Sequence, residues 1–143
     1  MNKVKIGVVG AGIYGTYHIR TYKCDPNVEK VVFCDLNEER KRIAEEKFGV
    51  KGYTSIKEMI ETEKLDAVSI ATSDPYHFGP CKDAIESGIK YLLIEKPMAL
   101  TVKECEEIIE LAKKNGVKIS VDFHKRWDPA YNCIKTDIKS EDK

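Results

Sequence analysis

The stretch VKIGVVGAGIYGTYHIRTYKCDPNVEKVVFCD, residues 4–35, contains the pattern that decides the fold. It starts with an apolar run, Val4–Val9, which has the length and composition of a strand buried on both faces. The glycine-rich segment GAGIYG follows at residues 10–15, then a helical pattern from Ile13 to about Tyr22, and then a second apolar run, Val31–Cys34. A strand, a glycine-rich turn, a helix and a second strand predict a βαβ unit with parallel strands.

The glycine-rich segment has the spacing G-x-G-x-x-G, in which each glycine has its own role. Gly10 allows the tight turn, Gly12 lets a pyrophosphate approach the backbone, and Gly15 lets the helix pack closely on the strand. Asp35 lies twenty residues after Gly15 at the end of the second strand, where a carboxylate can bind an adenosine ribose. The alternative is a purely structural turn, with Asp35 capping the next helix. The pattern favours a dinucleotide site at the helix N-terminus, and we include Ile13 and Tyr14 in it.

Short apolar runs alternate with amphipathic helices along the rest of the chain. Further strands are predicted near residues 50–53 (a weak edge strand), 67–71, 91–94 and 118–121. Further helices are predicted at 37–48, at about 77–87, and after two capping boxes that open at Ser55 and Thr101, with a last one at 130–138. The short connections force right-handed crossovers. We therefore expect an α/β fold, a doubly wound parallel sheet of order 3-2-1-4-5-6, covered by helices on both sides.

Polar residues follow two of these predicted strands at the carboxyl edge, where such sheets bind ligands. The segment Glu95-Lys96-Pro97 ends one strand, and the proline restricts Lys96 to extended geometry that can point into the crevice. A surface lysine beside a turn is the alternative. Ala71, Thr72 and Ser73 follow another strand and can face a cofactor with backbone and hydroxyl groups. His77 begins a helix, where a histidine is more often a hydrogen-bonding residue than a catalyst.

The composition excludes several classes of protein. The 143 residues include 24 basic and 24 acidic side chains, so the formal net charge is zero. Binding to a phosphate backbone needs a basic surplus, and we therefore expect no nucleic-acid partner. No apolar run approaches the roughly 18 residues of a membrane span, so we also expect no membrane partner. The five cysteines match no metal-binding spacing and no secretion signal is expected, which predicts free thiols, no metal and a cytoplasmic location.

Four segments, in this order and spacing, closely resemble the glucose–fructose oxidoreductase/inositol dehydrogenase family (Gfo/Idh/MocA). They are VVGAGIYG (8–15), IATSDPYHFGPCKDAIESG (70–88), LLIEKPMAL (92–100) and VDFHKRWDPAY (121–131). The resemblance implies an NAD(P)-dependent oxidoreductase that acts on sugars, polyols or their derivatives. It also implies that Lys96 lies beside the nicotinamide and the reacting hydroxyl, and that Glu95 helps to place it. Thr72, Ser73 and His77 would lie along the cofactor, and Arg126 near the substrate.

The resemblance also sets an expected boundary. Members of the family carry a second α/β domain that shapes the substrate pocket and supplies an aspartate and histidine pair. We assign residues 1–121 to the NAD(P)-binding domain and 122–143 to a segment leading toward that second domain, which we expect to be missing. The isolated chain is then expected to be inactive and monomeric or weakly dimeric, while the full-length protein forms a homo-oligomer. A dinucleotide-sensing module without catalysis is the main alternative, and a methyltransferase is disfavoured because Glu95-Lys96-Pro97 serves no methyl transfer.

The residues after Asp35 address the choice of cofactor. Leu36 and Asn37 follow it, instead of the serine or arginine that would accept a 2′-phosphate. A carboxylate facing a phosphate places like charges together, which disfavours NADP. Basic side chains at residues 40–42 lie close enough to compensate. We therefore predict NAD as the cofactor, with NADP bound more weakly.

Overall fold

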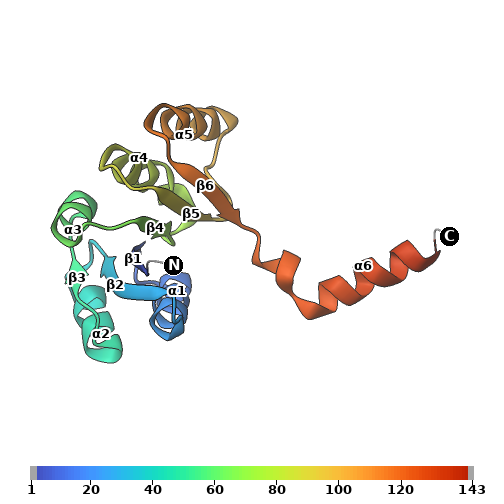
Figure 1. The fold of residues 1–143 in the computed structure, drawn as a ribbon, viewed down its shortest axis with the longest axis horizontal. Coiled ribbons are helices and arrows are strands. Elements are labelled where there is room, and N and C mark those ends of the chain that lie inside the picture. Colours follow the sequence, from blue (N-terminus) through green and yellow to red (C-terminus); the bar gives the residue numbers. More distant parts are fainter. Residues whose placement is uncertain (1–2, 142–143) are drawn as a thin grey trace.

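The computed structural model describes residues 3–141, whose strands form a single parallel sheet (Figure 1). The strands are β1 (Val4–Val9), β2 (Val28–Cys34), β3 (Gly52–Tyr53), β4 (Ala67–Ile70), β5 (Tyr91–Glu95) and β6 (Lys118–Asp122). Their order in the sheet is β3-β2-β1-β4-β5-β6, as expected from the sequence. Because the order reverses between β1 and β4, a crevice opens at the carboxyl ends of these two strands.

Helices connect the strands and begin where the sequence supplies a cap. They are α1 (Ile13–Cys24), α2 (Glu38–Phe48), α3 (Ile56–Glu63), α4 (Phe78–Glu86), α5 (Val102–Asn115) and α6 (Pro129–Glu141), with short 3-10 turns η1 (Asp74–Tyr76) and η2 (His124–Trp127). The side chains of Asn37, Ser55 and Thr101 accept hydrogen bonds from backbone N–H groups in the first turns of α2, α3 and α5. At Thr101 the capping box is complete, because Glu104 binds back to the Thr101 backbone.

Two apolar clusters hold the helices to opposite faces of the sheet. On one face α1 and α2 enclose Val8, Ile19, Phe33 and Ala44. On the other face α3, α4 and α5 pack on a larger cluster, whose fully buried members include Met59, Ile70, Cys81, Ile85, Leu92, Ile94 and Ile108. Side chains on a strand alternate between the faces, and buried residues occur on both sides of β1, β2 and β4. These strands therefore read as continuous apolar runs.

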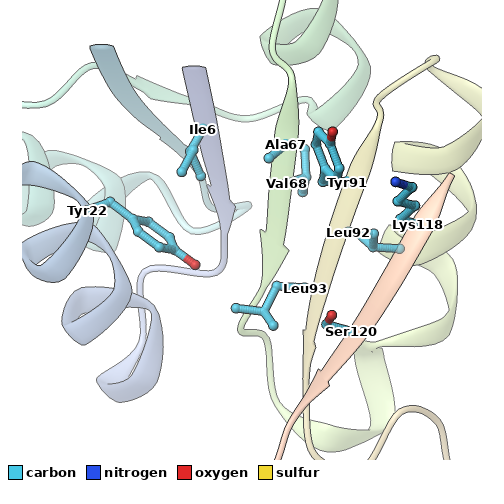
Figure 2. A pocket seen from close by; sticks show the side chains of 9 residues that line it. All are labelled: Ile6, Tyr22, Ala67, Val68, Tyr91, Leu92, Leu93, Lys118 and Ser120. Atoms are coloured by element: carbon cyan, nitrogen blue, oxygen red, sulfur yellow. The ribbon is translucent and has the colours of Figure 1, made fainter. Parts of the chain in front are cut away.

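Helices lie on both faces of the sheet, as expected, but part of the face that carries α1 is left uncovered by residues 3–141. On the α1 side, β5 and β6 carry no helix within residues 3–141: Tyr91 is 47% exposed, and Lys118 and Ser120 are exposed. A cavity of about 300 Å³ lies between this part of the sheet and α1. Figure 2 shows Tyr22 pointing from α1 toward the sheet, with Leu93 and Ser120 on the neighbouring strands. After β3 the chain crosses to β4 on the other side of β1, and the later helices pack on the opposite face. On this face α1 and α2 therefore cover only the half of the sheet that contains β1, β2 and β3.

The last described segment extends away from the sheet. After β6 the chain forms η2 and then α6, which projects from the body of the domain in Figure 1. The expected helix at 130–138 is present within α6, and Tyr131, Ile134 and Ile138 on it are more than half exposed. None of the described helices is long and apolar enough to cross a membrane.

Candidate functional site

The glycine-rich turn lies between the end of β1 and the start of α1, at the reversal point of the sheet. Gly10 has φ of +95°, and a Cβ there would lie 2.8 Å from the carbonyl oxygen of Ala71. A Cβ on Gly15 would lie 1.7 Å from the carbonyl oxygen of Gly10, so α1 packs directly on the turn. A Cβ on Gly12 would meet no atom within 4 Å, which leaves the backbone open on its outer side. These distances explain why the tight turn at Gly10 and the close packing of α1 at Gly15 require glycine. At Gly12 the backbone is open to the approach of a ligand.

The N-terminus of α1 differs from those of α2, α3 and α5, because no side chain caps it. Gly12 occupies the cap position, and the first turn contains no acidic residue. The N–H groups of a first helical turn have no partner inside the helix, and together they carry a partial positive charge. With Gly12 exposed and the space beside it open, the N–H groups at Ile13 and Tyr14 face a place where a pyrophosphate fits.

Asp35 follows β2, and its buried carboxylate connects three parts of the site. One oxygen accepts a hydrogen bond from the Ala11 N–H at 2.8 Å, and the other accepts one from the Asn37 N–H at 2.8 Å. The Arg40 guanidinium contacts both oxygens, with Nε 3.2 Å from Oδ2 and Nη2 3.2 Å from Oδ1. Asn37 caps α2 itself, so Asp35 is not the cap that the alternative interpretation required. Instead the carboxylate fixes the glycine-rich turn to the end of β2.

The charge of this carboxylate is stabilised despite its burial. Burial by itself raises the pKa of Asp35, but the hydrogen bonds from Arg40, Ala11 and Asn37 together outweigh it and lower the pKa below its ordinary value. The Arg40 side chain remains 57% exposed, and among the described residues its guanidinium contacts Asp35 alone. An ionised carboxylate at this position can accept hydrogen bonds from ribose hydroxyls.

Two exposed apolar side chains border this carboxylate and the turn. Leu36, directly after Asp35, is 85% exposed, and Ile13 at the start of α1 is 75% exposed. Apolar side chains left open beside polar groups suit a flat ring such as adenine. Sequence reasoning placed Ile13 at the site but used Leu36 only to judge the 2′-phosphate, although an apolar residue directly after the acidic one was visible in the sequence.

The second group of predicted residues lies at the carboxyl ends of β4 and β5. Glu95 ends β5 and is buried, and Lys96 follows it, half-buried, with a cis peptide bond to Pro97. Among the side chains that the structure describes, none makes a hydrogen bond or ion pair with the Lys96 ammonium. Thr72 and Ser73 follow β4, and the Thr72 hydroxyl donates to the Tyr76 carbonyl oxygen at 3.0 Å. The Ala71 N–H donates to the Val9 carbonyl oxygen, which joins this end of β4 to the end of β1.

His77 is fully buried and joins the two loops of this group. One ring nitrogen lies 2.6 Å from the carbonyl oxygen of Pro97, and the other lies 3.0 Å from that of Thr72. The buried ring thus joins the segment after β5 to the segment after β4. The predicted contact of His77 with a cofactor stays a prediction.

Sequence reasoning missed a polar cluster under Glu95. His18 on α1 lies 2.6 Å from Ser69 Oγ through Nδ1 and 3.0 Å from Glu95 Oε1 through Nε2, and Asp122 Oδ2 lies 4.0 Å from the same Nε2. Ser69, Glu95 and Asp122 lie on the α1 side of the sheet. Each comes two residues after a residue that lines the cavity on that side, namely Ala67, Leu93 and Ser120, and residues two apart on a strand share a face. The signal available was a polar residue inside an otherwise apolar strand at Ser69.

The same cluster contains the ligand types of a metal site. Single ligand atoms of His18, Glu95 and Asp122 lie within 4.8 Å of one another. The direct hydrogen bond between His18 and Glu95 already uses two of the three atoms. We therefore describe the cluster as a hydrogen-bonded network, and the absence of a metal stays a prediction.

Arg126 lies apart from the residues just described. It is exposed in η2, with its guanidinium 5.7 Å from the centre of the Phe123 ring. The neighbouring His124 approaches the start of α1, since its ring lies 6.2 Å from that of Tyr14. The segment that carries Arg126 is thus next to the glycine-rich turn, while the predicted substrate contact of Arg126 stays a prediction.

Comparisons with known proteins agree with this geometry. The model of the Gfo/Idh/MocA family, described as an oxidoreductase family with an NAD-binding Rossmann fold, matches residues 4–123. The inositol 2-dehydrogenase of Salmonella paratyphi B is 31% identical over 141 residues, which cover 96% of this chain and 42% of that protein.

Solved structures give the same picture. An NAD-binding protein from Listeria innocua superposes with a TM-score of 0.88 at 30% identity, covering 98% of this chain and 41% of that one. The myo-inositol 2-dehydrogenase of Lactobacillus plantarum superposes with a TM-score of 0.85 at 27% identity, covering 99% and 42%. The chain therefore spans about two-fifths of the length of the relatives it matches.

Proposed function

From the premise that this chain belongs to the Gfo/Idh/MocA oxidoreductase family, we propose that it is the NAD-binding domain of a dehydrogenase acting on a sugar, a polyol or a derivative. The observation that carries the proposal is the uncapped N-terminus of α1 beside the buried Asp35 carboxylate. One feature suits a pyrophosphate and the other a ribose, and Ala11 connects the two by a 2.8 Å hydrogen bond. The inositol dehydrogenases among the relatives support the class of substrate.

In this proposal the chain binds NAD across its carboxyl edge. The first-turn N–H groups of α1 bind the pyrophosphate, and Asp35 accepts hydrogen bonds from the adenosine ribose. Asp35 follows β2, on one side of β1, whereas Lys96 follows β5 on the other side. A dinucleotide with its adenosine at Asp35 therefore extends toward Thr72, Ser73 and Lys96 with its nicotinamide end.

The proposed role of Lys96 follows from its ammonium group, which has no partner among the described side chains. Bound NAD supplies the hydride acceptor, C4 of the nicotinamide. The Lys96 ammonium donates a hydrogen bond to the reacting oxygen of the substrate and stabilises the negative charge that develops there. Its two neighbours hold it in place, since Glu95 is fixed in the sheet and the Pro97 carbonyl oxygen is bound by His77. Arg126 is proposed to contact the substrate from η2.

A titration of the chain with NADH tests the proposal directly. We expect NADH fluorescence to change on binding with a 1:1 stoichiometry, and ADP-ribose to compete for the same site. Asp35→Ala should weaken both compounds at least tenfold, because the ribose loses its acceptor. A matched control, Asp66→Ala, removes an aspartate at the opposite end of the sheet, where it contacts Lys5 and Lys90, and should leave both affinities within twofold. Absence of binding by the unaltered chain would refute the proposal.

Two further parts of the proposal concern the isolated chain. We propose that it is inactive with polyols and aldoses and monomeric or weakly dimeric, and that catalysis and stable oligomers require additional chain of the kind its relatives contain. A dehydrogenase assay with a substrate panel, combined with size-exclusion chromatography, tests both statements. Turnover by the isolated chain would show that the active site has been misplaced. We also propose a cytoplasmic location, which the five free cysteines support.

A non-catalytic sensor of dinucleotides is the second candidate. It shares the whole binding site and differs only in Lys96, which would then have no reacting oxygen to contact. A protein that carries this domain and binds NAD, yet has no substrate pocket, would favour the sensor.

A further inference from the structure

The cluster around His18 connects the two ends of the proposed dinucleotide site. His18 lies one helical turn after Gly15, on the helix whose N-terminus faces the pyrophosphate. Its ring contacts Ser69 on β4 at 2.6 Å and Glu95 at the end of β5 at 3.0 Å. One side chain thus joins α1 to two strands on the far side of β1, across 51 and 77 residues of sequence.

The chemistry of the partners sets the state of the ring. A carboxylate only accepts hydrogen bonds, so Nε2 carries the hydrogen and donates it to Glu95. In that tautomer of the neutral ring Nδ1 carries no hydrogen, so the Ser69 hydroxyl, which rotates to suit its partner, donates to it. Tyr22 packs edge-on against the ring, with the centroids 5.9 Å apart and an interplanar angle of 84°. The ring is therefore fixed in orientation from three sides.

The position of the Glu95 carboxylate depends on its contact with His18, because the contact is buried and a second carboxylate lies nearby. Glu95 is 5% exposed and His18 is 11% exposed in its side chain, so little water competes for the hydrogen bond. Asp122 approaches the same nitrogen at 4.0 Å from β6, and Glu95 pairs with Asp122 in the sheet. Without His18, the carboxylates of Glu95 and Asp122, whose ligand oxygens lie within 4.8 Å of each other on neighbouring strands, would stand side by side with no ring between them. Like charges at this separation repel, and Glu95 would have to move.

We propose that His18 is a positioning residue for the nicotinamide end of the site. By holding Glu95, it fixes the backbone of residues 95–97, beside which the nicotinamide binds, relative to the helix that binds the pyrophosphate. The inference rests on the proposed function, since it concerns how one bound molecule is held at both ends. It assigns to α1 a second task beside phosphate binding, performed one turn further along the helix.

Two ligands separate this role from a structural one. NADH reaches both ends of the site, whereas ADP-ribose lacks the nicotinamide and reaches only the first. His18→Phe fills the volume of the ring but donates nothing to Glu95. We expect this variant to bind NADH about tenfold more weakly and ADP-ribose within twofold of the unaltered chain. His18→Gln, whose amide nitrogen can take the place of Nε2, should recover most of the NADH affinity.

The outcomes of the experiment are distinct. Equal losses of NADH and ADP-ribose affinity in His18→Phe would overturn the inference, because His18 would then support the helix as a whole. Unchanged NADH affinity would overturn it as well. If His18→Phe fails to fold, His18→Leu and Ser69→Ala are measured with the same two ligands, and the second should show a smaller but equally selective loss. Failure of the unaltered chain to bind either ligand would instead refute the proposed function.

Discussion

The two ends of the site are built in different ways. The proposed adenosine end, from Gly10 to Arg40, belongs to one βαβ unit and the start of the helix after it, and its carboxylate binds partners 2, 5 and 24 residues away. The nicotinamide end, around Lys96, is held by contacts that join residues 20 to 77 positions apart. The first end is specified by a short motif, whereas the second depends on the assembly of the whole sheet. Reagents that act on one end and spare the other can test this difference.

The largest effect is expected at Gly15. Its missing Cβ would lie 1.7 Å from the Gly10 carbonyl oxygen, and both groups are backbone, so α1 must move away from the turn. Gly15→Ala should lower the free energy of unfolding by roughly 3 kcal/mol and abolish NADH binding. Urea denaturation and a fluorescence titration measure the two effects.

Gly12→Ala is the matched control for this change. A Cβ at Gly12 meets nothing within 4 Å, and φ of −75° suits alanine. We expect the free energy of unfolding to change by less than about 1 kcal/mol, while NADH affinity falls because the methyl group occupies the approach of the pyrophosphate. Similar stability losses at both glycines would show that the contact distance at Gly15 does not govern the packing of α1.

The next effect concerns Lys96 at the other end. In a protein of full family length that carries this domain, Lys96→Ala should lower kcat roughly a hundredfold, the scale of a lost catalytic group. The ammonium has no partner within residues 3–141, so NADH affinity and the midpoint of thermal unfolding should barely change. A variant that unfolds early but keeps normal turnover would make Lys96 structural.

The choice between NAD and NADP depends on Asp35 at the proposed adenosine end. Asp35 is ionised and buried, and the phosphate of NADP would face it. We expect NADH to bind at least tenfold tighter than NADPH, about 1.4 kcal/mol, in parallel titrations. Because Arg40 is exposed and paired with Asp35, Asp35→Ser should free the guanidinium and narrow the ratio. Equal affinities in the unaltered chain would contradict the assignment of NAD.

The smallest effect is the acid dependence that Asp35 gives to folding. Its pKa is lowered in the folded chain, so its stabilising contribution is complete above the ordinary carboxyl range and is lost as the pH falls through the lowered value. We expect Asp35→Asn to lose less stability than the unaltered chain between pH 6 and pH 3, by about 0.5–1 kcal/mol, since Arg40 is exposed to water.

Glu63 provides the reference for that measurement. A hydrogen bond from Lys30 is the main reason that the pKa of Glu63 is lowered to about 2. The resulting pH dependence of folding is the same in the unaltered chain and in Asp35→Asn. The difference between their pH profiles therefore isolates Asp35. Parallel profiles would show that the charge of Asp35 adds nothing to folding.

Periodicity was enough to predict most of the fold. Val4–Val9 is a strand with the expected bounds, and the sheet order follows from the alternation of strands and helices. The predicted strand at 50–53 shortens to Gly52–Tyr53, because only these two residues pair with β2. Helices lie on both faces as expected, but the pattern did not predict that β5 and β6 are uncovered on the α1 side within residues 3–141, since coverage depends on which way each crossover turns. Local patterns carry no information about an empty place above β5 and β6.

The sequence by itself predicted the main features of the proposed adenosine end. A tight turn and a close helix follow from the spacing of three glycines, because both need only neighbouring backbone, and the distance from Gly15 predicts a carboxylate at the end of the second strand, Asp35. Tertiary structure alone decided that Asp35 binds Ala11, that His77 binds two loops, and that His18 lies under Glu95. These contacts form where strands distant in sequence become neighbours in the sheet. A side chain's partner there depends on the order of the strands and on which face it occupies, and both are fixed only when the chain has folded.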